Sequence, residues 1–130
     1  MSLNRRDARK FAMEKIYQME LSKDYSIDFV TKALEEIDGE QKVYVRELLT
    51  YLALNSEEIH NIVLEHSRIK NLSRMLKTDL AIIELAIMEQ KIDIEIPVQV
   101  SVNEATELSK VYGNENNARF VNGILRNIFK

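Results

Sequence analysis

The chain has 130 residues, carries a formal net charge of −3 and contains no cysteine. This length suits one domain with an apolar core, and the lack of cysteine excludes disulfides, a thiol nucleophile and a zinc–thiolate site. The apolar runs are far shorter than a membrane span, and the first residues lack the apolar stretch of a signal peptide. We therefore expect a cytoplasmic protein with no membrane contact.

The first half of the chain predicts four amphipathic helices. One proline and three glycines in the whole sequence leave few helix breakers, which favours long helices. Apolar residues recur with helical spacing, and Asp38-Gly39 and Asn55 or Ser56 mark helix boundaries. The expected helices cover residues 5–21, 26–37, 40–54, and from 55 or 56 to about 66.

The second half predicts a buried central helix and two more helices. Residues 79–90 are apolar almost all round, which places that helix in the middle of the fold. In residues 92–100, an isoleucine or valine stands at every second position, as in a half-buried strand. The sequence offers no second strand to pair with this one, and Pro97 lies inside it, so we predict an extended connector. A capping box at residues 101–104 starts the next helix, which Gly113 ends, and the last helix covers residues 117–129. The prediction is an all-α fold with about seven helices.

Four cations occupy the first turns of the first helix, namely Arg5, Arg6, Arg9 and Lys10. These turns carry the positive end of the helix dipole, where each cation is disfavoured by a few tenths of a kcal/mol. The dipole therefore offers no stability reason for placing them there.

Helical spacing assigns some of these cations to one stripe with an aromatic ring. Intervals of four, three and four residues align Arg6, Lys10, Met13 and Tyr17, nearly opposite the core face that begins at Ala8. We expect Met13 and Tyr17 to be partly exposed beneath the cations. Cations for phosphates beside a ring for stacking are the ingredients of single-stranded RNA recognition.

The charge along the chain is segregated. Residues 24–58 hold nine acidic and three basic residues, whereas residues 110–130 hold four basic and one acidic. An acidic protein can bind RNA only through such a local basic patch. A solvated basic helix with an incidental tyrosine is the alternative that the residues leave open.

The last helix carries a second cation beside an aromatic ring, Arg119 and Phe120, followed by Gly123. A glycine inside a helix costs about 1 kcal/mol relative to alanine, so we expect Gly123 to allow the close approach of another helix. Phe120 could equally belong to the core.

Catalytic and metal-binding signatures are scarce. The sequence has neither a glycine-rich phosphate loop after a strand nor a serine-centred elbow. Glu57 and His60 form one Glu-x-x-His, which is half of the motif of carboxylate di-iron bundles, but a second pair is missing. Packing explains His66 better than metal ligation does. We therefore predict no enzyme activity, no metal site and no cofactor.

Four stretches follow one another along the chain in the order RRDARKFAMEKIYQMEL, RMLKTDLAIIELAIMEQ, IPVQVSVNEATELSKVYG and ARFVNGILRNI. Together they resemble the NusB family of bacterial transcription antitermination factors. The resemblance covers essentially the whole chain and is weakest over residues 24–70. The most specific stretches are Asn-Glu-Ala-x-Glu-Leu at 103–108 and Phe-Val-Asn-Gly at 120–123, whereas Glu84 departs from the arginine usual in the family.

The resemblance implies a fold, a function and partners. The fold would be two small helical bundles packed across each other, about residues 1–54 and 55–130. The protein would bind boxA RNA together with the ribosomal protein NusE, within the RNA polymerase antitermination complex that reads through terminators in ribosomal RNA operons. The RNA contacts carried over are Arg5, Arg6, Arg9, Tyr17, Arg119 and Phe120, to which the charge stripe adds Lys10. Asp79, at the start of the central helix, would face NusE.

Three alternatives differ in function. One is a helical protein–protein interaction module that homodimerises and binds no RNA. Another is an RNA-binding accessory domain without antitermination activity, as found at the start of some ribosomal RNA methyltransferases. A di-iron enzyme fails on the number of ligands. Homodimerisation in the absence of NusE is left open.

Overall fold

Helices build the whole fold. The computed structural model describes residues 2–130. The elements are α1 (Arg5–Ser22), α2 (Ile27–Leu34), α3 (Gln41–Glu65), the 3-10 helix η1 (Leu72–Arg74), α4 (Lys77–Ile92), α5 (Val98–Tyr112) and α6 (Glu115–Ile128). Residues 2–130 contain no strand, only an isolated bridge between Ser2 and Asp38. The all-α prediction is confirmed.

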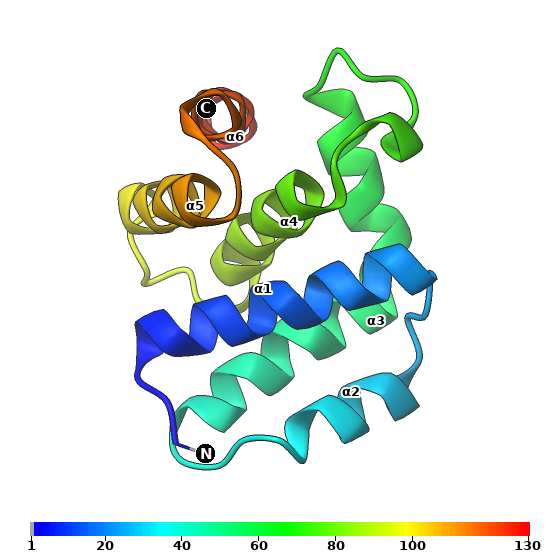
Figure 1. The fold of residues 1–130 in the computed structure, drawn as a ribbon, viewed down its shortest axis with the longest axis vertical. Coiled ribbons are helices and arrows are strands. Elements are labelled where there is room, and N and C mark those ends of the chain that lie inside the picture. Colours follow the sequence, from blue (N-terminus) through cyan, green and yellow to red (C-terminus); the bar gives the residue numbers. More distant parts are fainter. Residues whose placement is uncertain (1) are drawn as a thin grey trace.

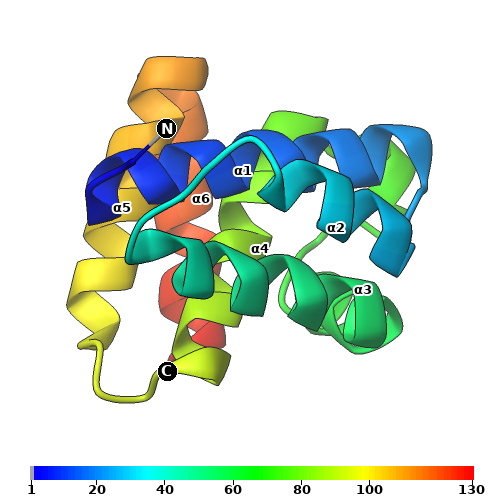
Figure 2. The same cartoon turned by 90° about the horizontal axis from the view of Figure 1, so that it is seen from below.

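Helix α4 lies at the centre and packs against α1, α3, α5 and α6 (Figure 1). Every residue from Asp79 to Glu89 is buried, as its apolar circumference predicted. Helices α1 and α3 run across the direction of α4, α5 and α6 (Figure 2). This is the crossed arrangement that the family resemblance implied.

Helix α3 joins two segments that the sequence predicted as separate helices. Asn55 leaves the helical region at φ −133° and ψ 29°, and its Nδ2 donates to the carbonyl of Tyr51 at 3.0 Å. An asparagine side chain that competes for backbone groups in this way bends a helix. The kink coincides with the expected boundary near residue 54, while the division into two sub-bundles stays a prediction.

Helix α5 begins at Val98, three residues earlier than predicted. Pro97 suits the position before the first turn, because its φ is fixed and it has no N–H to leave unpaired. The Ser101 hydroxyl does not cap the helix but donates to Glu89 Oε1 at 2.6 Å. The alternating stretch is therefore a short connector followed by the first turn of α5.

Helix α1 is buried over a wider arc than predicted, because it packs against both α3 and α4. Met13 is buried, so the expectation that it is exposed was wrong. A rotation of about 100° per residue places Arg6, Lys10 and Tyr17 just beyond Met13, at the edge of the buried arc. Arg6 and Lys10 are exposed there, and Tyr17 is half-buried.

The expectation for Gly123 was also wrong. A Cβ at this position would have no heavy atom within 4 Å, and the residue is exposed. Helix packing therefore does not require this glycine.

No helix within residues 2–130 combines the length and the apolar composition needed to cross a bilayer.

Candidate nucleic-acid interface

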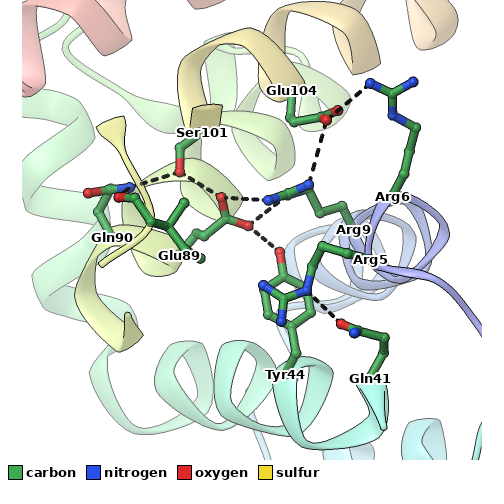
Figure 3. Close-up of polar contacts among 10 residues, drawn as sticks. Arg5, Arg6, Arg9, Gln41, Tyr44, Glu89, Gln90, Ser101 and Glu104 are labelled. Atoms are coloured by element: carbon green, nitrogen blue, oxygen red, sulfur yellow. Dashed lines mark hydrogen bonds and ion pairs between the residues drawn. The ribbon is translucent and has the colours of Figure 1, made fainter. Parts of the chain in front are cut away.

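Arg9 is a buried residue at the meeting point of four helices (Figure 3). It is 7% exposed, and its guanidinium donates to the two carboxylate oxygens of Glu89 at 2.8 and 3.3 Å. The hydroxyls of Tyr44 and Ser101 donate to the same carboxylate. The sequence offered no stability reason for a cation here, and the structure corrects that view because Arg9 neutralises a buried carboxylate from α4.

The electrostatics of this cluster keep both partners charged. Burial raises the pKa of Glu89, but hydrogen bonds from Arg9, Ser101 and Tyr44 outweigh it and hold the pKa below its usual value. Burial, and then the Glu89 charge, raise the pKa of Tyr44. The group is a closed ion pair with its hydrogen bonds satisfied, which is the condition under which a buried pair is tolerated.

Arg5 is also held by the fold. Its Nε donates to Gln41 Oε1 at 2.6 Å, and its guanidinium carbon lies 3.9 Å from the centroid of the Tyr44 ring. Stacking of this kind is a cation–π contact. Arg5 therefore fixes the start of α1 against α3 (Figure 3).

Arg6 and Lys10 are exposed at the edge of this cluster, where Glu104 Oε1 also lies 3.6 Å from Arg9 Nη1. The Arg6 side chain is 75% exposed, with Nη2 3.1 Å from Glu104 Oε1. Lys10 is exposed and makes no hydrogen bond or ion pair with any residue between 2 and 130. Both line a groove of about 240 Å³ between α1 and α5, together with Asp7, Arg9, Glu104, Glu107, Leu108 and Val111.

Tyr17 differs from the other four tyrosines. The hydroxyls of the others each donate to a glutamate carboxylate, in the pairs Tyr25–Glu20, Tyr44–Glu89, Tyr51–Glu58 and Tyr112–Glu14. The Tyr17 hydroxyl has no hydrogen bond within the described residues, and its ring packs at the edge of the core. This ring is positioned by the core but is not committed to a polar partner.

The structure separates the second basic–aromatic pair from the first. Arg119 is exposed and donates to Asn116, and Phe120 is exposed rather than part of the core. Both line a groove of about 500 Å³, together with Gly123, Ile124, Asn127 and residues 66–69. Arg119 and Phe120 therefore belong to a different surface from Arg6 and Lys10.

Asp79 is buried between α4 and α6. Asn117 Nδ2 donates to its two carboxylate oxygens at 3.2 and 3.3 Å, and burial raises the pKa of Asp79 against this hydrogen bond. Its position in the first turn of α4 also suits the helix dipole. The carboxylate is thus committed within the fold, and its contact with a partner stays a prediction.

Sequence reasoning missed the role of Glu89, Ser101 and Glu104 in holding the basic helix. One available signal was the presence of Glu84 and Glu89 in a helix that is otherwise apolar all round. A buried charge requires a partner, so these glutamates predict a buried donor elsewhere in the chain. The sequence does not say which donor, because Arg9 and Glu89 lie 80 residues apart.

Comparison with known proteins identifies the family. Residues 6–130 match the sequence profile of the NusB family. The chain belongs to this family. The transcription antitermination protein NusB of Alkaliphilus oremlandii is 39% identical over 125 residues, which cover 95% of this chain and 91% of that protein. NusB of Acetivibrio thermocellus is 38% identical over 130 residues, covering 98% and 90% of the two chains.

Solved structures agree with this assignment. NusB of T. maritima matches with a TM-score of 0.85 and 29% identity, covering 98% of this chain and 92% of that one. A chain from the crystal structure of antitermination factors NusB and NusE in complex with dsRNA matches with a TM-score of 0.82 at 23% identity, covering 96% and 95%. The latter likeness shows a shared fold, and the family resemblance in the sequence is confirmed.

Proposed function

We propose that this NusB family member is a transcription antitermination factor that binds boxA RNA together with NusE. The observation that carries this proposal is the family match over residues 6–130, with curated relatives named as transcription antitermination proteins. The chain would act in the cytoplasm as a non-catalytic subunit of the RNA polymerase antitermination complex, in support of read-through in ribosomal RNA operons.

The edge of α1 is the proposed primary RNA surface. Lys10 forms no ion pair with a carboxylate of residues 2–130, so it can neutralise a phosphate without breaking one. Arg6 would exchange the single Glu104 contact for a phosphate, and Tyr17 would stack on a base. Arg5 and Arg9 would contribute mainly by fixing α1 in position.

The α6 groove is the proposed second RNA surface. Arg119 supplies a charge and Phe120 supplies an exposed ring. Asp79 would support the NusE contact indirectly, because its bonds to Asn117 hold α6 against α4.

A titration with and without NusE tests the proposal. Fluorescein-labelled boxA RNA is titrated with the chain, and anisotropy is recorded at several salt concentrations. We expect weak, salt-sensitive binding by the chain alone and tighter binding after NusE is added. Absence of RNA binding in both arms, by a folded protein, would leave the helical interaction module as the better description.

Substitutions on α1 locate the RNA surface. Removing one phosphate contact from a single strand reduces the slope of log K against log salt by about 0.7, so we expect this reduction for Lys10→Ala. Tyr17→Ala should cost about 1–3 kcal/mol of binding free energy if the ring stacks on a base. Tyr17→Phe should bind normally, because stacking requires the ring and not the hydroxyl.

The matched control is Lys32→Ala, which removes an exposed lysine from α2. It should leave the salt slope unchanged. Equal effects of Lys10→Ala and Lys32→Ala would show that binding depends on overall charge and not on the edge of α1.

A further inference from the structure

Three helices bring two carboxylates and an imidazole together on the side of α4 that faces α1 and α3. Glu20 comes from α1, His60 from α3 and Glu84 from α4. One ligand atom from each residue lies within 4.8 Å of the other two. His60 Nε2 is 2.7 Å from Glu20 Oε2 and 3.5 Å from Glu84 Oε2.

Glu84 is the unexplained member of this cluster. Its exposure is 0%, and neither carboxylate oxygen has a hydrogen-bond partner within the described chain. Glu20, which is 3% exposed, is satisfied by His60 and by the Tyr25 hydroxyl at 2.5 Å. A buried polar group without a partner is costly, and this one faces two other groups that can bind a cation.

We propose that Glu20, His60 and Glu84 bind one divalent transition-metal ion, with Zn²⁺ as the best-matched probe. Imidazole nitrogen and carboxylate oxygen are both ligands of Zn²⁺, and the two carboxylates balance its charge. Bonds of about 2.0–2.2 Å in a tetrahedral site place ligand atoms about 3.3–3.6 Å apart. The His60–Glu84 separation of 3.5 Å matches this spacing, and the His60–Glu20 separation of 2.7 Å is shorter. A side-chain shift of less than about 1 Å at Glu20 therefore suffices once the ion replaces the His60–Glu20 hydrogen bond.

The cluster is accessible from one side. The His60 side chain is 23% exposed and lines a groove of about 510 Å³ with Tyr25, Ser56, Glu57 and Asn61. Glu20 and Glu84 are buried behind His60, so an ion would reach them past the His60 ring, and a water from the groove would take the fourth coordination position. Three protein ligands with one open position form a recognised type of zinc site.

These ligands differ from the Glu-x-x-His pattern in the sequence. Glu57 is exposed and is not among the three residues whose ligand atoms converge. The site depends on carboxylates that lie 40 residues before His60 and 24 residues after it. The sequence prediction of no metal site depended on the missing second Glu-x-x-His pair and on the packing of His66, and neither reveals ligands that lie so far apart in the chain.

A shared proton is the competing occupant. Without an ion, burial and then the neighbouring Glu20 carboxylate raise the pKa of Glu84 well above its usual value. A protonated Glu84 beside an ionised Glu20 would also reduce the charge of the cluster. The two occupants predict different responses to added metal.

Equilibrium dialysis of the tag-free chain against Zn²⁺ tests the site, with bound metal measured by atomic emission. We expect one ion per chain. Glu84→Gln and His60→Gln should each weaken binding at least tenfold, while the matched control Glu57→Gln, one helical turn before His60, should bind like the wild type. Co²⁺ should give visible absorption bands of a low-coordinate site in the wild type and not in Glu84→Gln.

Stability measurements separate loss of ligands from loss of fold. Glu84→Gln should retain the helical circular dichroism spectrum, because the replaced group has no hydrogen-bond partner to lose. Zn²⁺ should raise the melting temperature of the wild type and Glu57→Gln but not of Glu84→Gln. The proposal is overturned if the wild type binds no Zn²⁺, or if Glu84→Gln and His60→Gln bind as well as Glu57→Gln; the cluster then holds a shared proton only.

Discussion

Arg9 and Arg6 stand in the first turns of the same helix, yet burial gives them different roles. Arg9 is closed into an ion pair with Glu89, whereas Arg6 touches a single carboxylate and keeps most of its surface in water. If Arg9 bound a ligand instead of Glu89, the Glu89 carboxylate would be left buried and unpaired, which is costly. The basic start of α1 therefore divides into residues that hold the helix and residues that are free to bind.

Replacing Arg9 tests the structural half of this division. Arg9→Met should lower the free energy of unfolding by about 3–5 kcal/mol, because the Glu89 carboxylate remains buried without its cation. Arg6→Ala should cost less than about 1 kcal/mol, as is typical of an exposed ion pair. Urea unfolding followed by circular dichroism measures both, and equal losses would contradict the assignment.

The pH dependence of stability provides a second residue-scale test. Since the folded-state pKa of Glu89 lies below its usual value, its ionisation stabilises the fold above the unfolded pKa, about 4.3. This contribution is lost as pH falls through the folded pKa. The stability difference between wild type and Glu89→Gln should therefore narrow between pH 6 and pH 3.

Urea denaturation across that pH series measures the difference. Other carboxylates titrate in both proteins, including Glu20, whose pKa is lowered to about 2 against the effect of burial by hydrogen bonds that begin with His60. Their contributions cancel in the comparison. A difference that stays constant with pH would mean that Glu89 does not titrate with a lowered pKa.

At the scale of elements, the sequence predicted what depends on one helix and missed what depends on its neighbours. A helix that is apolar on all sides is stable only in the interior of a protein, so the sequence correctly predicted the central position of α4. Met13 is buried because α1 has two packing partners, and periodicity in α1 alone does not reveal the second. Ser101 begins a capping-box sequence, but its hydroxyl donates a hydrogen bond to Glu89 of α4 instead of capping α5.

The candidate site shows the same division. Spacing along α1 correctly predicted that Arg6 and Lys10 are exposed and aligned with Tyr17. It did not predict that Arg9 is buried, because its partner on α4 lies far away in the sequence. Local spacing thus predicts which residues share one side of a helix. Contacts with residues distant in the sequence determine which of those charges are already paired within the fold.

Gly123 lies inside α6, where glycine is less favourable than alanine. Its replacement tests whether the glycine serves RNA binding. A Cβ at this position meets nothing within 4 Å, so Gly123→Ala should raise the free energy of unfolding by up to about 1 kcal/mol. We also expect weaker RNA binding, because Gly123 lines the same groove as Arg119 and Phe120. Thermal unfolding and RNA anisotropy measure the two effects.

The two readouts for Gly123→Ala have separate meanings. A loss of stability would show that the methyl group meets an unseen packing constraint. A gain in stability with unchanged RNA affinity would remove the α6 groove from the proposed RNA surface.

At the scale of the whole molecule, charge is used in two ways that respond differently to salt. The Arg9–Glu89 pair is enclosed by four helices, whereas Lys10 and Arg6 face water on an acidic protein. Exposed charges are screened over about 10 Å at 0.1 M salt, and buried pairs are screened much less. Added salt should therefore affect ligand binding and folding to different extents.

We expect RNA affinity to fall linearly on a log–log plot between 50 and 300 mM salt, with a slope that reports the phosphates contacted. Over the same range, the free energy of unfolding in urea, which adds no ions, should change by less than about 1 kcal/mol, because the ion pair that holds α1 is buried. Arg9→Met should remain much less stable than the wild type at every salt concentration. The contrary result is that salt lowers the stability of the wild type in parallel with its RNA affinity. The exposed cations on α1 would then also stabilise the fold, and the division between residues that hold α1 and residues that bind RNA would be wrong.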